Sequence, residues 1–108
     1  MALQTLNFTF ESANREQMAK EWSHLGVTGS GDMECLMEKI DLQGGVKAKV
    51  VTPVKGFDKV WERMIKKFVN DTGAGNVSIE INDDNAPPIV VYMRLRQAWA
   101  EATAKEAV

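Results

Sequence analysis

The chain has 108 residues, of which 44% are hydrophobic and 26% charged, and its formal net charge is −2 at pH 7. This length fits a single domain, residues 1–108, and is sufficient to bury a substantial core. The 13 Lys and Arg residues are outnumbered by 15 Asp and Glu residues and are spread along the chain. The composition therefore argues against a nucleic-acid-binding protein, which would present clustered cationic side chains.

The cysteine content indicates a reducing environment. Because Cys35 is the single cysteine, it cannot form an internal disulfide, and we expect a cytoplasmic protein. Together with His24, the single histidine, it offers too few ligands for a metal site. Residues 1–10 alternate polar and apolar side chains, unlike a secretory signal. No apolar run approaches the roughly 20 residues of a membrane-spanning helix, so no membrane association is expected.

The N-terminal third predicts one strand and one glycine-rich loop. Leu6, Phe8 and Phe10 alternate with polar residues, which indicates a half-buried strand. Residues 12–22 form either a short helix capped by Ser12 or a surface loop. Residues 26–32 read Gly-Val-Thr-Gly-Ser-Gly-Asp, a composition typical of a turn with positive backbone φ angles.

The middle of the chain predicts two further strands, at residues 33–41 and 46–54. Between them lies Gln-Gly-Gly at residues 43–45. A short glycine turn between two strand patterns predicts an antiparallel hairpin.

The period then changes from that of a strand to that of a helix. Residues 57–69 carry apolar side chains at helical spacing, and Gly73 and Gly75 end the pattern. Residues 77–82 alternate again, which predicts a strand. Pro87 and Pro88 suit the first turn of a final helix, whose buried face would comprise Val91, Leu95, Ala98, Trp99 and Ala102. The element order predicts a two-layer α+β fold, a mainly antiparallel sheet with two helices packed on one face, instead of a four-helix bundle.

Ser30 is the residue whose surroundings point most clearly to chemistry. Gly29 and Gly31 remove the Cβ atoms that would crowd its hydroxyl, so a bulky group could approach or be attached. Asp32 could accept a hydrogen bond, position a metal or orient the incoming group. Taken alone, such a stretch before a strand is more often a plain turn. It is neither a nucleophile elbow nor a phosphate-binding loop.

Other candidate residues have simpler structural interpretations. His24 and Cys35 form the single possible thiol–imidazole pair, but a surface histidine and a buried cysteine are expected instead. Asp83 and Asp84 could form an acid or metal pair, yet acidic residues before a helix are typical of capping. Lys66 and Lys67 are expected to form a solvated helix end.

Four stretches, in order, resemble the acyl carrier proteins of malonate decarboxylases, the delta subunits. They are residues 29–34 (Gly-Ser-Gly-Asp-Met-Glu), residues 51–54 leading to the helix around Trp61, residues 77–83, and residues 88–98. The likeness spans roughly residues 26–102. The acyl carrier subunit of citrate lyase is similar more distantly, through Ser-Gly-Asp.

The resemblance implies a cofactor and partners. Ser30 would bear phosphoribosyl-dephospho-coenzyme A through a phosphodiester, with Gly29, Gly31 and Asp32 beside it. The arm's thiol would hold acetyl, a transferase subunit would exchange acetyl for malonyl, and decarboxylase subunits would then remove CO₂, in malonate catabolism. A prosthetic-group transferase would attach the arm. The chain itself would be a non-catalytic carrier without catalytic residues.

Other functions remain open on the residues alone. One is a carrier for a related lyase complex such as citrate lyase. Another is a small α+β interaction module in which Ser30 is a turn residue without a prosthetic group. An independent enzyme is disfavoured because no set of nucleophile, base and orienting residue can be assembled.

Overall fold

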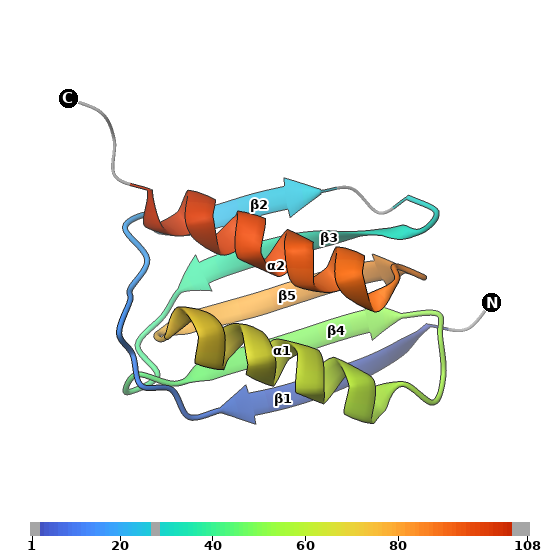
Figure 1. Ribbon diagram of the computed structural model, residues 1–108, viewed down its shortest axis with the longest axis horizontal. Helices are drawn as coiled ribbons and strands as arrows, with labels where there is room; N and C mark the ends of the chain where they lie inside the picture. Colours follow the sequence, from blue (N-terminus) through green and yellow to red (C-terminus); the bar gives the residue numbers. More distant parts are fainter. Residues whose placement is uncertain (1–2, 27–28, 105–108) are drawn as a thin grey trace.

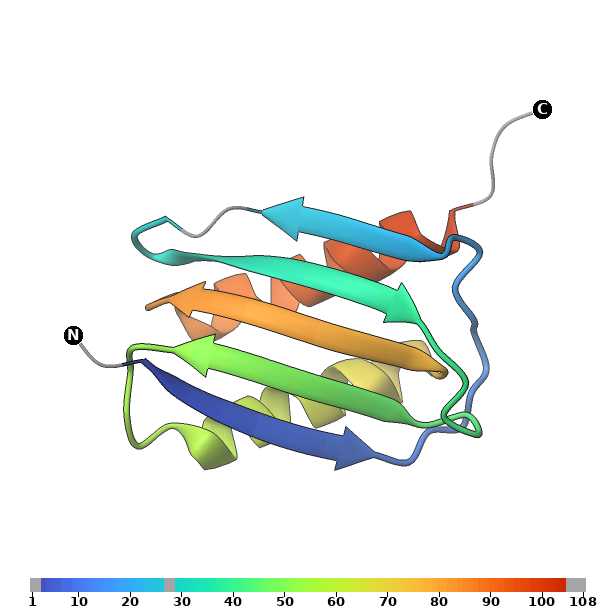
Figure 2. The ribbon, with the colours of Figure 1, turned by 180° about the vertical axis from the view of Figure 1, so that it is seen from behind.

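The computed structural model describes residues 3–26 and 29–104, and within them five strands and two helices form. Both helices cover the same face of one sheet, and the other face is bare (Figures 1 and 2). The predicted two-layer α+β fold is thus confirmed. The elements are β1 (Gln4–Phe10), β2 (Trp22–Gly26), β3 (Asp32–Lys39), β4 (Val46–Thr52), α1 (Asp58–Thr72), β5 (Val77–Asp84) and α2 (Pro88–Thr103).

The strand order in the sheet is β1-β4-β5-β3-β2. β5 pairs antiparallel with β3 and parallel with β4, so the predicted hairpin of residues 33–41 with 46–54 is wrong. The connection from β4 through α1 to the adjacent parallel β5 is a βαβ unit, which places β5 where a hairpin partner would lie. Asn76 fills the resulting turn, since its Oδ1 accepts hydrogen bonds from the backbone N–H groups of Leu42 (3.1 Å) and Gly44 (2.8 Å).

The core lies between the sheet and the two helices. Alternate residues of the three central strands point into it, and so do residues at helical spacing on α1 and α2, as the sequence periodicities predicted. Phe68 of α1 and Trp99 of α2 meet edge to face with ring centroids 6.2 Å apart. Their contact joins the two helices over the middle of the sheet.

Of the two alternatives for residues 12–22, the surface loop is confirmed and the short helix is wrong: residues 11–21 are a mostly exposed connection without helix, and β2 begins at Trp22. They cross one end of the sheet, from β1 at one edge to β2 at the other (Figure 2). Met18 is buried, and the N–H groups of Ala19 and Lys20 donate to the carbonyl of Ala102 at 2.9 and 3.2 Å. The N–H of Glu16 donates to the carbonyl of Gly73 at 3.2 Å. This crossing segment therefore fastens the C-terminal ends of both helices.

The helix boundaries follow ordinary backbone chemistry. α1 ends at Gly73, which has φ +68° and donates its N–H to the carbonyl of Val69 at 2.8 Å, as glycine at this position commonly does. α2 begins at Pro88, whose missing N–H would have no helical partner. Neither of these two helices is long and apolar enough to cross a membrane.

Candidate functional site

Ser30 lies in the connection between β2 and β3. These strands pair antiparallel from Trp22 opposite Glu38 to Gly26 opposite Glu34, and the chain then turns beyond the end of the sheet (Figure 1). Ser30 is exposed at this turn. Val27 and Thr28, also placed in the glycine loop by the sequence, lie outside the described residues.

Gly31 shapes the turn and ties it to the sheet. Its φ is +74°, and a Cβ at this position would have no heavy atom within 4 Å. Glycine is therefore required here for its backbone conformation and not by close packing. The N–H of Gly31 donates to the carbonyl of Asp84 at 2.8 Å, and the N–H of Asp32 donates to the carbonyl of Gly29 at 2.9 Å. The Ser30 hydroxyl thus stands on a hydrogen-bonded turn in open surroundings.

Asp32 fixes the same turn to α2 through Arg94. Arg94 Nε and Nη2 donate to the two carboxylate oxygens of Asp32 at 3.0 and 2.8 Å, the two-pronged geometry that suits a guanidinium and a carboxylate. These bonds, helped by one from the backbone N–H of Met33, hold the pKa of the Asp32 carboxyl below its ordinary value. The pKa of Arg94 is raised by the same pair. Both groups are charged at neutral pH, and their charges cancel.

Sequence reasoning did not single out Arg94 as a site residue. It belongs to α2, 62 residues from Asp32, and it reaches the turn because α2 packs over β3 and β2. A cation on the polar side of the last predicted helix was visible in the sequence. Its pairing with Asp32 was not, because that requires the true position of α2 over the sheet.

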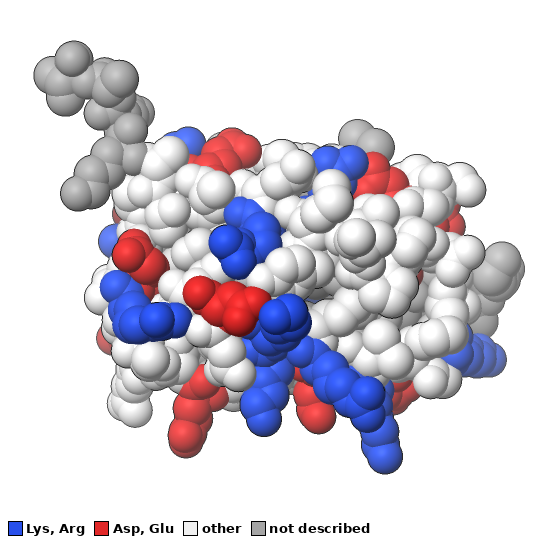
Figure 3. Space-filling model, viewed as in Figure 1, with Lys and Arg blue, Asp and Glu red and all other residues white. Residues whose placement is uncertain are grey.

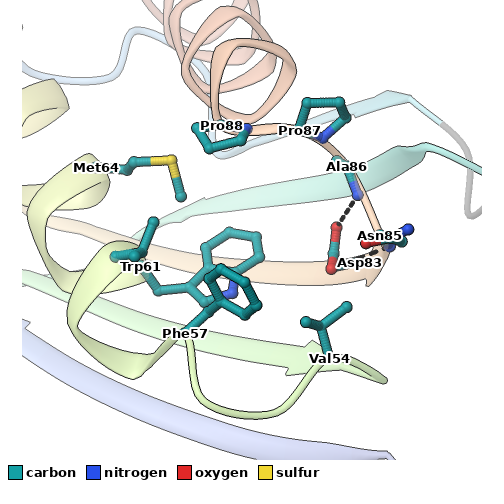
Figure 4. Close-up of a pocket in the computed structure, with 10 residues that line it drawn as sticks. Val54, Phe57, Trp61, Met64, Asp83, Asn85, Ala86, Pro87 and Pro88 are labelled. Carbon is teal, nitrogen blue, oxygen red and sulfur yellow. Dashed lines mark hydrogen bonds between the residues drawn. The ribbon is translucent and has the colours of Figure 1, made fainter.

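A cavity of about 240 Å³ opens at the same end of the sheet. We call it the α1–α2 cavity. It is lined by Val54, Phe57, Val60, Trp61, Met64, Asp83, Asn85, Ala86, Pro87 and Pro88. Figure 4 shows Phe57, Trp61 and Met64 facing Pro87 and Pro88 across it, with Asp83 at the β5 side.

Asp83 is the buried polar group of this cavity, with 5% of its surface exposed. Its Oδ2 accepts hydrogen bonds from Thr52 Oγ1 (2.8 Å) and the Asn85 N–H (3.2 Å), and its Oδ1 accepts one from the Ala86 N–H (2.9 Å). Asp83 therefore stabilises the turn into α2. The capping interpretation of Asp83 and Asp84 is therefore wrong: the N-cap residue of α2 is Pro87, and no side chain caps the helix, because the bonds of Asp83 precede the first helical residue.

The surface around the cavity carries few charges. Figure 3 shows charged side chains gathered along α1, whereas the surface over the first half of α2 is largely uncharged. Several apolar side chains are exposed here, namely Phe57 (47%), Ile89 (70%) and Met93 (48%). The surface over the first half of α2, at the end that bears Ser30, thus exposes apolar side chains and few charges.

The other candidate pairs do not assemble. His24 points to the bare face of the sheet, where its Nε2 lies 3.0 Å from Glu34 Oε2, whereas Cys35 is fully buried and its pKa is raised to about 12 by burial. They therefore form no thiol–imidazole pair. Asp83 and Asp84 are consecutive in β5, so their side chains point to opposite faces. Lys67 lies on the exposed side of α1, 3.0 Å from Asp71.

Comparison with known proteins identifies the family of this chain. The family model of the malonate decarboxylase delta subunit (MdcD) matches residues 20–102. The malonate decarboxylase acyl carrier protein of Malonomonas rubra is 50% identical over 104 residues, covering 96% of this chain and 93% of the relative. The protein of the same description from Stenotrophomonas maltophilia K279a is 36% identical over 96 residues, covering 89% and 91%.

A solved structure extends the likeness to the fold. A chain in the crystal structure of a Pseudomonas malonate decarboxylase hetero-tetramer in complex with malonate superimposes with a TM-score of 0.80 and 30% sequence identity. The superposition covers 92% of this chain and 98% of that one. The chain therefore belongs to the family of malonate decarboxylase acyl carrier proteins, the delta subunits.

Proposed function

We propose that this chain holds acetyl and malonyl thioesters on a phosphoribosyl-dephospho-coenzyme A arm joined to Ser30 Oγ by a phosphodiester. The observation that carries the proposal is the position of Ser30. It is an exposed hydroxyl on a turn that Gly31 and Asp32 bind to β5 and α2. A carrier needs such an anchor, accessible to the modifying enzyme and fixed in place afterwards.

The described residues fit a phosphodiester at Ser30. Ser30 is exposed, and a Cβ on the adjoining Gly31 would meet nothing within 4 Å beyond its chain neighbours, so the turn is uncrowded on the side of Gly31. The carboxylate of Asp32 would repel an anionic phosphate if it stood alone. Arg94 neutralises that carboxylate through two hydrogen bonds, so Asp32 adds no net negative charge beside the attachment site.

When bound, the arm supplies a thiol that carries malonate as a thioester, whose carbonyl delocalises the negative charge left by loss of CO₂ better than the second carboxylate of free malonate. The role of the chain's own residues is anchoring. Ser30 provides the bond, while Gly29, Gly31 and Asp32 hold the turn in shape. Decarboxylation, acetyl-for-malonyl exchange and attachment of the arm then fall to partner proteins, and we infer a non-catalytic carrier in the cytoplasm.

The proposed partners are the other subunits of a malonate decarboxylase. The similar Pseudomonas chain is part of a hetero-tetramer in complex with malonate. The exposed apolar side chains of Phe57, Ile89 and Met93 lie at the same end as Ser30. Burial of these side chains against a partner would place the anchored arm at that interface.

Intact-mass spectrometry of the chain purified from its native host tests the proposal. We expect a mass increment equal to the arm, located in the peptide that contains Ser30. The increment should disappear in Ser30→Ala, together with decarboxylase activity of the complex. Ser78→Ala, a serine change elsewhere on the sheet, is the matched control and should keep both.

Thiol labelling adds an independent readout. Burial raises the pKa of the Cys35 thiol to about 12, so it should react with iodoacetamide only as the protein unfolds. After hydroxylamine removes the acyl group, a modified chain should therefore show one fast-reacting thiol, and Ser30→Ala should show none. An unmodified native chain, together with full activity of a complex containing Ser30→Ala, would overturn the proposal.

A further inference from the structure

We propose that the α1–α2 cavity shelters the acetyl thioester end of the arm anchored at Ser30 and rejects the malonyl end. The inference rests on the proposed function and extends it to a second site on this chain. It assigns the cavity to the arm itself and not to a free metabolite or to a peptide from a partner.

The first support is proximity. The N–H of Gly31 is bonded to the carbonyl of Asp84 in β5, and the adjoining Asp83 lines the cavity. Val54, on the far side of the cavity, follows the next strand, β4. Because neighbouring strands are about 5 Å apart, the attachment turn and the cavity are separated by on the order of 10 Å.

The arm can span this distance. A pantetheine chain is about as long as three residues of extended polypeptide, on the order of 10 Å, and the phosphates and sugars add to its reach. Tethering also raises the local concentration of the arm's end to the millimolar range. A cavity that binds the free group weakly is therefore occupied much of the time when the group is tethered.

The size and lining of the cavity suit a small uncharged group. Its 240 Å³ corresponds to roughly eight water molecules at about 30 Å³ each, enough for an acyl thioester and a few adjoining atoms but too small for the whole arm. Trp61, Phe57 and Met64 face the interior (Figure 4). Aromatic rings and a thioether pack favourably against a thioester sulfur.

Asp83 gives the cavity its selectivity. It is the charged residue among the described residues that line the cavity, and its oxygens already accept bonds from Thr52, Asn85 and Ala86. A malonyl carboxylate would enter an apolar space beside the Asp83 carboxylate, where the nearby hydrogen-bond donors already bond to Asp83, and this is unfavourable. The neutral acetyl group carries no such penalty. The charge at the end of the arm thus decides whether the arm rests on the carrier or stays exposed to partner subunits.

NMR spectroscopy of the ¹⁵N-labelled modified chain tests the inference directly. The spectra of the acetyl-loaded, malonyl-loaded and unmodified forms would be compared. We expect the Trp61 indole N–H and the Ala86 amide to shift in the acetyl form and to match the unmodified chain in the malonyl form. Trp22, which is 63% exposed, and Trp99, which is buried against Phe68, serve as internal controls.

Thioester cleavage provides a second measurement. Hydroxylamine converts an accessible acetyl thioester to acetyl hydroxamate and free thiol. If the arm's end spends at least half its time in the cavity, the acetyl-loaded chain should react about twofold or more slowly than S-acetyl pantetheine in solution. Val60→Phe, which fills the cavity, should abolish this protection. Ile89→Ala, an exposed α2 residue outside the lining, should retain it.

The outcomes separate this inference from the proposed function. Absence of the arm from Ser30 contradicts the proposed function. An arm that is present but leaves Trp61 and Ala86 unchanged, or shifts them equally in the acetyl and malonyl forms, overturns the sheltering role alone. Cleavage of the acetyl-loaded chain at the rate of free S-acetyl pantetheine does the same.

Discussion

Glycines at the two ends of the sheet differ in how closely other atoms approach them. At the end crossed by residues 11–21, a Cβ on Gly75 would lie 2.5 Å from the carbonyl oxygen of Gly44 and 2.4 Å from Asn14 Oδ1. At the end that bears Ser30, a Cβ on Gly31 or Gly56 would meet nothing within 4 Å, yet both glycines have positive φ angles, +74° and +84°. Gly75 is therefore required by packing, whereas Gly31 and Gly56 are required by backbone conformation. Gly26, at the start of the Ser30 turn, is required by both, since its φ is +84° and a Cβ would lie 2.3 Å from the carbonyl oxygen of Met33.

This difference separates the parts of the molecule that provide stability from the part that can carry a function. The crossing segment binds the C-terminal ends of both helices through Ala19 and Glu16. Asn76, at the same end of the sheet, binds the connection between β3 and β4. The Ser30 end keeps empty space around a turn that is held by a few specific bonds. A large group can be attached there without disturbing the core.

The largest expected effect comes from adding a methyl group at the packed end. Gly75→Ala should lower the free energy of unfolding by about 3 kcal/mol, because the new Cβ forces the backbone of Gly44 to move. Urea denaturation followed by circular dichroism measures this change. Gly31→Ala is the matched comparison and should cost only about 1 kcal/mol, for its positive φ. Equal losses in the two variants would contradict the contrast between the two ends.

Removing the buried hydroxyl at the Ser30 end should have a smaller effect. Thr52→Val deletes two hydrogen bonds of the Thr52 hydroxyl, the one it donates to Asp83 (2.8 Å) and the one it accepts from the Val54 N–H (3.1 Å). A buried carboxylate oxygen then has one donor fewer, and we expect a total cost of about 2 kcal/mol. Thermal unfolding would report the loss. Thr9→Val, on an exposed position of β1, should change stability by less than about 0.5 kcal/mol. A Thr52→Val protein as stable as this control would mean that the bond contributes nothing.

The smallest effect concerns the Arg94–Asp32 pair, and it appears on acidification. Because the pKa of Asp32 is lower in the folded chain than its ordinary value of 3.8, the pair contributes stability above that pH. The contribution is lost as the pH falls through the folded-state pKa. Carboxyl ¹³C NMR should show Asp32 titrating below its ordinary value and, in Arg94→Met, at a higher pH than in the unchanged chain.

Arg96→Met tests whether this shift is specific to Arg94. Arg96 bonds to the Tyr92 hydroxyl at 3.0 Å and not to Asp32, so its removal should leave the Asp32 titration unchanged. A titration midpoint that does not respond to Arg94→Met would show that the pair does not form in solution.

Much of the fold was predictable because hydrophobic periodicity reports which side of an element is buried. The patterns at Leu6–Phe10, Phe57–Val69 and Val77–Ile81 correspond to β1, α1 and β5. β2 was missed because its inward positions are Ser23 and Leu25. Ser23 is buried with its hydroxyl 3.3 Å from the carbonyl of Ala98, so a polar residue interrupts the expected alternation.

The order of the strands in the sheet was less predictable than the buried side of each strand or helix. Hydrophobic periodicity does not indicate which strands pair. The glycines at residues 44 and 45 are also typical of a hairpin turn, although β3 and β4 do not pair with each other. The partner of β3 is β5, whose Asp84 lies opposite Asp32. Without this pairing the sequence could place Ser30, Gly31 and Asp32 on one loop but could not bring Arg94 or the carbonyl of Asp84 to them.

In the sheet, β5 lies between β4 and β3, which both precede it in the chain. This order has a consequence during protein synthesis. Asp32 leaves the ribosome 62 residues before Arg94, and Asp84 also emerges long after the loop. A nascent or truncated polypeptide therefore displays the serine without the brace that shapes its turn. Under the proposed function, a modifying enzyme that recognises the braced turn would not modify such incomplete chains. The arm would then be attached only to subunits that have finished folding.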